Sequence, residues 1–100
     1  MLTPKMYVLV RKDLSETYRM VQGAHALAQF ALEHPEEFAR WNNETIVFLS
    51  VRNYKELKNI YCELLKRKTS SGFYESDLED QLTAIACYDT GEFFKDFYTV

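Results

Sequence analysis

The chain has 100 residues, 47% of them hydrophobic and 15% aromatic, and a formal net charge of −3 at pH 7. This length fits a single domain over residues 1–100, and the apolar content excludes an intrinsically disordered chain. A dedicated nucleic-acid-binding protein would usually be basic overall, and this chain is slightly acidic. No segment approaches the roughly 18 consecutive apolar residues of a membrane helix. We therefore expect no membrane association.

The first strand is predicted over residues 6–12, which are apolar and rich in β-forming residues. A helix is predicted over residues 15–33, because the segment holds many alanines and ends where a proline follows. Asp13 and Glu16 have the spacing of a capping box, and Ser15 is the alternative cap. The sequence therefore places the helix directly after the strand.

The middle of the chain predicts a helix, a strand and a helix. A short helix over residues 35–41 begins with a proline at its favoured first position. Residues 45–51 are β-branched and apolar, which favours a strand. Asn53 is expected to cap a third helix that ends near Lys66, because its apolar residues recur at helical spacing.

The last third predicts a turn at residues 70–72, a brief strand at 73–75, a polar loop at 76–80 and a strand at 82–88. The order is thus strand, helix, helix, strand, helix, strand, strand, followed by an aromatic tail. Strands separated by helices require at least partly parallel pairing. We expect the α/β class, with a small four-stranded mixed sheet and helices on both faces.

The tail at residues 91–98 is rich in aromatic side chains. Four of them recur at helical spacing: Phe93, Phe94, Phe97 and Tyr98. Large aromatic side chains are rarely left in water. The tail is therefore expected to form a short helix or turn, packed either on its own sheet or across a homodimer interface.

The two cysteines, Cys62 and Cys87, lie far apart in apolar segments. A secreted domain of this size usually carries more cysteines, paired in disulfides. We expect two reduced, packed thiols and a cytoplasmic protein. The histidines, cysteines and acidic residues do not have the spacing of a metal site, so neither a metal nor another cofactor is expected.

A polar stripe marks the long predicted helix. Tyr18, Gln22, His25 and Gln29 are spaced four, three and four residues apart, which places them on one helix face. The helix begins at the carboxyl end of the first strand, where open α/β sheets bind ligands. The stripe indicates either a binding site or a solvated face, and a histidine bonded within the core is a further alternative.

The sequence resembles the type II peptidyl-tRNA hydrolases. The segments VLVRKDL and QGAHALA are similar to the opening of that family, in which a strand ends in Arg-x-Asp-Leu and a helix carries Gln-x-x-His-Ala. The matching residues are Arg11, Asp13, Leu14, Gln22, His25 and Ala26. A looser match extends over residues 5–88, through Trp41, residues 51–53 and the threonine-bearing segment 82–86.

The resemblance implies a small cytoplasmic α/β protein, commonly dimeric, that cleaves the ester between a peptide and tRNA without a cofactor. It implies that His25 orients or deprotonates water, that Gln22 holds His25 or the substrate, and that Thr83 donates to the oxyanion. The residues that would meet the tRNA or a nucleotide-like ligand are Arg11, Tyr18 and Arg19.

Two family residues are changed in this chain. Tyr18 stands where the family has a lysine, and the family's Asp-Ala-Gly turn is missing, with Asp77 and Asp80 in the corresponding loop. Loss of one charged group can lower the rate of an enzyme by a factor on the order of 10²–10³. The sequence thus supports a divergent hydrolase or, alternatively, a catalytically idle homologue that binds a nucleotide, an RNA end or a protein partner.

Overall fold

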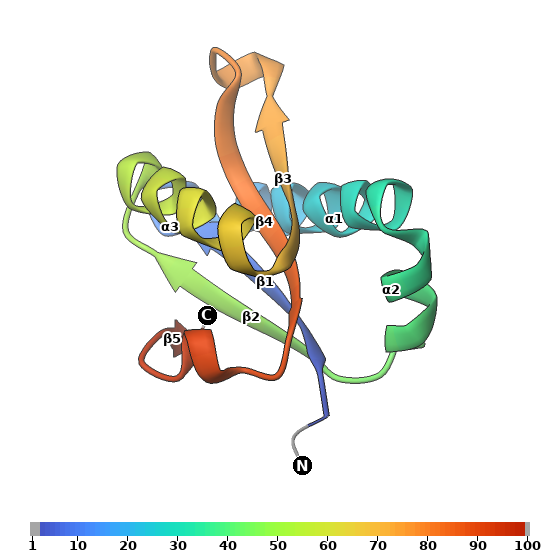
Figure 1. The fold of residues 1–100 in the computed structure, drawn as a ribbon. Coiled ribbons are helices and arrows are strands. Elements are labelled where there is room, and N and C mark those ends of the chain that lie inside the picture. The colour runs from blue at the N-terminus through green and yellow to red at the C-terminus, as the bar shows by residue number, and fades with distance from the viewer. Residues whose placement is uncertain (1–2, 100) are drawn as a thin grey trace.

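The computed structural model describes residues 3–99 and has the predicted α/β architecture, with helices on both faces of a mixed sheet (Figure 1). Four strands form its main part, and a two-residue strand extends one edge. The elements are β1 (Lys5–Arg11), α1 (Glu16–Glu33), α2 (Pro35–Trp41), β2 (Ile46–Val51), α3 (Tyr54–Arg67), β3 (Thr69–Glu75), η1 (Ser76–Leu78), β4 (Gln81–Asp89), η2 (Glu92–Phe94) and β5 (Tyr98–Thr99). Among the described residues, no helix is both long and apolar enough to cross a membrane.

The sheet has the strand order β3-β4-β1-β2-β5, with β1 at its centre. Strand β1 pairs in parallel with β2 and antiparallel with β4, and β4 pairs antiparallel with β3. The carboxyl ends of β1 and β2 therefore lie at the same edge of the sheet. The tip of the β3–β4 hairpin projects beyond the sheet at the top of Figure 1.

Alternation along β1 divides the core into two layers. Met6, Val8 and Val10 belong to the layer under α1 and α2, whereas Tyr7 and Leu9 belong to the layer under α3. Successive side chains of a strand point to opposite faces, so a strand covered on both sides is apolar throughout. This explains the uninterrupted apolar run in the sequence.

The cap of α1 differs from the first expectation. The Ser15 side chain accepts the hydrogen bond of the Tyr18 backbone N–H, whereas the Asp13 carboxylate receives two hydrogen bonds from the Arg11 guanidinium. The capping box built on Asp13 is therefore wrong, because its carboxylate has a stronger, charged partner. The expected Asn53 cap of α3 is confirmed by the bond from the Glu56 N–H.

Strand β3 begins at Thr69, so the turn predicted at residues 70–72 is wrong. Its small residues serve close packing instead. The Ser71 hydroxyl is buried and donates to Glu33 of α1 at 2.6 Å. A Cβ on Gly72 would lie only 2.9 Å from the ring of Tyr61 on α3. Small residues are needed here because helices approach this strand from both faces.

The aromatic tail packs on its own domain. Phe94 is 4% exposed, and its ring centroid lies 4.7 Å from that of Tyr7 in the α3-side layer. The tail is a single 3₁₀ turn, followed by β5, which pairs with β2. The expected turn is present, but the sequence analysis missed the short strand.

Candidate functional site

A β-bulge in β4 turns Thr83 toward α1. The pairing of β3 with β4 shifts between Phe73, which faces Ala84, and Tyr74, which faces Leu82, so Thr83 is the extra residue. Leu82 lies in the layer under α3 and Ala84 in the layer under α1. Strict alternation would have sent Thr83 to the α3 side. A bulge redirects a side chain in this way, and here it brings the hydroxyl to Gln22.

A chain of hydrogen bonds connects β4, α1 and β3. The Thr83 hydroxyl donates to Gln22 Oε1 at 2.6 Å, and Gln22 Nε2 donates to Glu75 Oε1 at 2.8 Å. Gln22 and Thr83 are fully buried, although they stand 61 positions apart in the sequence. The Thr83 proton is therefore directed at Gln22 and away from any ligand, which makes Thr83 a positioning residue. Gln22 likewise holds Glu75, whereas the family resemblance implied His25 or the substrate.

Glu75 is the acidic residue of this site, and the sequence analysis missed it. The hydrogen bond from Gln22 lowers the pKa of its carboxyl group, assisted by the backbone N–H of Asp77 and the nearby charge of His25. The carboxylate is therefore ionised and held in one orientation at neutral pH. Its position at the end of a strand, one residue before an acidic loop, was the available signal, but Asp77 and Asp80 drew attention to the loop itself.

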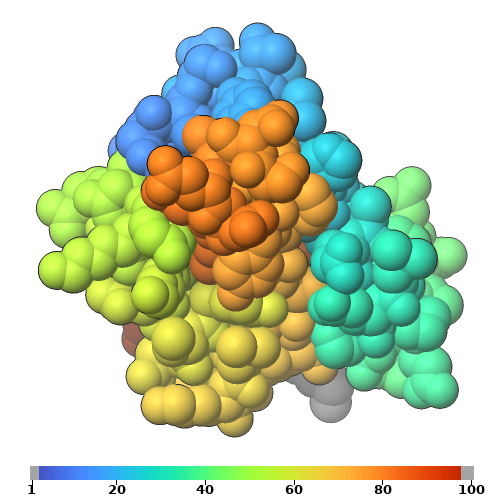
Figure 2. Space-filling view, turned by 90° about the horizontal axis from the view of Figure 1, so that it is seen from above, coloured from blue at the N-terminus to red at the C-terminus, as the bar shows by residue number. Residues whose placement is uncertain are grey.

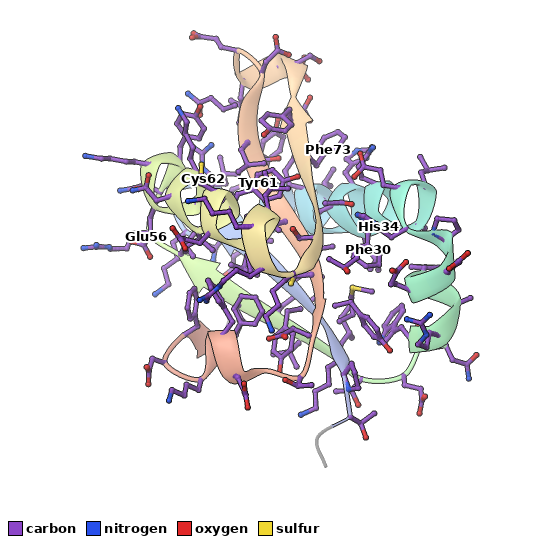
Figure 3. All side chains as sticks on the ribbon, viewed as in Figure 1. Phe30, His34, Glu56, Tyr61, Cys62 and Phe73 are labelled. Atoms are coloured by element: carbon purple, nitrogen blue, oxygen red, sulfur yellow. The ribbon has the colours of Figure 1, made fainter. Side chains whose placement is uncertain are left out.

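His25 lies beside this carboxylate on the exposed surface of α1. Its imidazole stacks on the ring of Phe73, with 4.5 Å between the ring centroids and an interplanar angle of 9°. Figure 3 shows Phe73 on the side of β3 that faces α1. Stacking orients the imidazole while leaving it open to solvent. His25 is therefore not a core histidine. Phe73 holds its imidazole in place, and the exposed ring can exchange a proton with a bound molecule.

Tyr18 completes the exposed part of the site, one helical turn before Gln22. Partial desolvation raises the pKa of its hydroxyl, and the negative charges of Glu75 and Asp77 and a hydrogen bond to Glu75 raise it further. The phenol therefore stays neutral beside the carboxylates. Where the family has a lysine cation, this site has a hydrogen-bond donor among acidic groups.

Arg11 and Arg19 do not join this group. The Arg11 guanidinium is 5% exposed and donates to Asp13, to the Gln81 side chain and to the Leu82 carbonyl oxygen. These contacts give it a structural role at the base of the β3–β4 hairpin.

Arg19 donates to the Leu14 carbonyl oxygen and lines a cavity of about 350 Å³ on another side of α1. The other lining residues are Val10, Glu16, Thr17, Met20 and Phe48. The structure thus brings His25, Gln22, Thr83 and Tyr18 together and separates both arginines from them.

The arrangement offers an oriented carboxylate, an accessible imidazole and a neutral phenol at the seam between α1 and the β3–β4 hairpin. Figure 2 looks down on the tip of this hairpin, which lies between the first turns of α1 and those of α3. No group of three or more histidine, cysteine or acidic side chains within residues 3–99 could hold a metal ion. The described groups are suited to moving a proton to or from a bound molecule.

No family model matches the sequence, and no curated protein aligns with it significantly. A similar fold occurs in the solved structure of a protein of unknown function from Agrobacterium tumefaciens strain C58. The two chains are 16% identical, with a TM-score of 0.73, and the match covers 100% of this chain and 99% of the other. At this identity the likeness shows the fold alone.

Proposed function

We propose that the chain is a divergent relative of the type II peptidyl-tRNA hydrolases that hydrolyses the ester between a peptide and tRNA in the cytoplasm. The observation that carries the proposal is the hydrogen-bonded series from Thr83 through Gln22 to Glu75, next to His25. Thr83, Gln22 and His25 match the family in sequence. They lie together in the structure, although β4 carries Thr83 and α1 carries Gln22 and His25. A chance resemblance would not require that meeting.

In the proposed reaction His25 takes a proton from water as the water oxygen attacks the ester carbonyl carbon. The ionised Glu75 stabilises the imidazolium that forms. The bond from the carbonyl carbon to the 3′ oxygen of tRNA then breaks, and the proton passes from His25 to that oxygen. Tyr18 offers the neutral hydrogen-bond donor of its hydroxyl group near the reacting ester. The products are a free peptide carboxylate and a free tRNA end, so no cofactor takes part.

A second candidate is an idle binding module, and the acidity of the site favours it. Tyr18 replaces the family's cation, and Glu75 and Asp77 are the charges that act on it. An acidic surface repels the phosphates of a nucleotide or RNA end and attracts a basic segment of a protein partner. In that case the Thr83–Gln22–Glu75 series would present a binding carboxylate instead of assisting proton transfer.

The deciding experiment is hydrolysis of an N-acetylated aminoacyl-tRNA, measured beside a family enzyme at equal concentration. We expect wild-type turnover and a loss of about 10²-fold or more in His25→Ala and Glu75→Gln. Gln29→Ala on the same helix and Glu63→Gln on α3 are the matched controls and should retain wild-type turnover. Absence of wild-type turnover would reject the hydrolase and leave the binding module.

Self-association through the outward face of α1 is a further part of the proposal. Met20 and Leu32 are exposed to 65% and 78%, and Ala24 and Ala28 lie between them at steps of four. Around a two-fold axis between Ala24 and Ala28, each alanine would face the other alanine of the second copy, and the small side chains would let the two helices approach closely. Sedimentation should show a homodimer, and Ala28→Glu should yield a folded monomer. A wild-type monomer at high concentration would reject this interface.

A further inference from the structure

The cavity of about 350 Å³ beside the first turns of α1 lies outside the site around His25. Three apolar side chains line it, those of Val10, Phe48 and Met20, and three polar ones, those of Glu16, Thr17 and Arg19. Its volume is near the lower end of the roughly 300–1,000 Å³ that is usual for ligand pockets. The cavity therefore suits a small molecule that has both an apolar and a polar part.

Gly23 allows the ring of Phe48 to lie against α1 at this cavity. A Cβ on Gly23 would lie 2.7 Å from Phe48 Cε2 and 3.3 Å from Val10 Cγ1. Glycine weakens the interior of a helix, so its presence in the middle of α1 is explained by this close approach. Phe48 is only partly buried where it packs on the core layer under α1. The ring is thus held in place and leaves apolar surface open to a ligand.

The backbone fixes the guanidinium of Arg19 at the same cavity. Arg19 Nε donates to the Leu14 carbonyl oxygen at 2.9 Å, and the side chain is partly buried. Within residues 3–99, its two terminal nitrogens have neither a hydrogen bond nor an ion pair. A guanidinium that is held by Nε keeps these donors for a carboxylate, which arginine binds with two parallel hydrogen bonds.

Glu16 adds the opposite charge to the cavity lining. It precedes Arg19 by three residues on α1, and side chains at this spacing are neighbours on the helix surface. The two charges do not pair, and the Glu16 carboxylate has no other partner in the part of the chain that the structure describes. An anion alone would be repelled by Glu16, and a cation alone by Arg19. A ligand that complements both groups carries an anionic and a cationic group close together.

We propose that this cavity binds a free α-amino acid with a bulky apolar side chain. The carboxylate of the ligand pairs with the terminal nitrogens of Arg19, its ammonium group pairs with Glu16, and its side chain packs on Phe48. The proposal does not depend on ester hydrolysis at His25, since the two sites share no residue. Of the lining residues, only Met20 also belongs to the α1 face proposed for self-association.

The test is an NMR titration of the full chain with L-phenylalanine, followed through the backbone amide signals of Gly23 and Phe48. We expect saturable binding with a dissociation constant on the order of 1 mM, as is usual for a ligand of this size. Phenylpropionate lacks the ammonium group and phenylethylamine lacks the carboxylate. Each should bind at least about tenfold more weakly, because one charged contact is lost. L-Alanine, which lacks the ring, should not saturate.

Variants assign the two charges to their residues. Arg19→Gln should weaken binding of L-phenylalanine about tenfold or more. Arg40→Gln, the same charge change at an exposed position of α2, is the matched control and should leave the affinity unchanged. Glu16→Gln should abolish the preference for L-phenylalanine over phenylpropionate, because Glu16 is the partner of the ammonium group.

Absence of saturation by L-phenylalanine would overturn the proposal. Equal binding of L-phenylalanine and phenylpropionate would do so as well, and so would equal effects of Arg19→Gln and Arg40→Gln. The ligand comparisons use the wild-type chain, so they decide the question even if Arg19→Gln loses stability together with its bond to Leu14.

Discussion

Thr83 Oγ1 lies 2.6 Å from Gln22 Oε1, and both residues are fully buried. Replacing Thr83 by valine keeps the shape but leaves the Gln22 oxygen without its donor. We expect Thr83→Val to lose about 1–3 kcal/mol in urea unfolding. The double variant with Gln22→Leu should lose less than the sum of the single variants, because the uncompensated polar group disappears. Additive losses would show that the two side chains are not coupled.

Tyr18 tests whether the missing cation limits the hydrolase. Tyr18→Lys would place a positive charge among Glu75 and Asp77, the carboxylates that now raise the pKa of the phenol. We expect turnover of peptidyl-tRNA to rise about tenfold, as electrostatic stabilisation of the transition state requires. Tyr18→Phe, which removes the donor without adding charge, should not rise. An increase in both variants would point to a steric effect.

Protonation of Asp89 makes the stability of the fold depend on pH in the acidic range. Lys68 Nζ lies 2.8 Å from Asp89 Oδ1. Burial alone would raise the Asp89 pKa, but the hydrogen bonds from Lys68 and the Gly91 N–H outweigh it and lower the pKa below its ordinary value of 3.8. The unfolded chain therefore binds this proton more readily. The contribution to stability is complete above pH 3.8 and is lost as the pH falls through the folded pKa.

Asp89→Asn should accordingly lose about 1–3 kcal/mol at pH 7 and show a shallower loss of stability in acid. Glu63→Gln is the control, because its contact with Lys66 spans 3.9 Å on the surface. Exposed pairs contribute little, so this variant should stay within about 1 kcal/mol of the wild type. Equal acid slopes in Asp89→Asn and the wild type would contradict the assignment.

The tail supplies part of the core. Replacing Phe94 by alanine leaves a cavity beside the ring of Tyr7, because Phe94 is buried there. Phe94→Ala should therefore lower the free energy of unfolding by about 3–5 kcal/mol. Gly91→Ala should also destabilise, because Gly91 has a φ of +107° and a Cβ there would contact the Tyr7 hydroxyl. Urea unfolding measures both. Sedimentation should show an unchanged mass, and a fall from dimer to monomer would instead mean that the tail is an interface.

The two thiols should differ in reactivity. Cys62 is exposed on α3, whereas Cys87 is buried in the sheet, where desolvation and the charge of Asp89 raise its pKa to about 12. Because the thiolate is the reacting species, iodoacetamide should label Cys62 in the folded protein and Cys87 only after unfolding. Mass spectrometry of the labelled peptides distinguishes them. Rapid labelling at Cys87 would show that β4 opens readily.

The sequence predicted the order of elements because hydrophobic spacing and proline or asparagine boundaries are local signals. It did not predict β3 at Thr69, where small residues are needed because α1 packs on one face of the strand and α3 on the other. At the site, spacing on α1 placed Tyr18, Gln22 and His25 on one face. The bulge at Thr83 and the position of Glu75 depend on strand register, which no local pattern encodes. Arg11 looked accessible because its partners Gln81 and Leu82 lie 70 and 71 positions away in the sequence.

The central position of β1 has a consequence for biosynthesis. Strand β1 leaves the ribosome well before β4, which flanks it on one side and ends at Asp89. Until β4 has been translated, one edge of a strand that is apolar on both faces has no native partner. Nascent chains stalled before β4 should therefore be protease-sensitive and prone to aggregate. The Thr83–Gln22 contact can form only after β4 has followed α1 out of the ribosome.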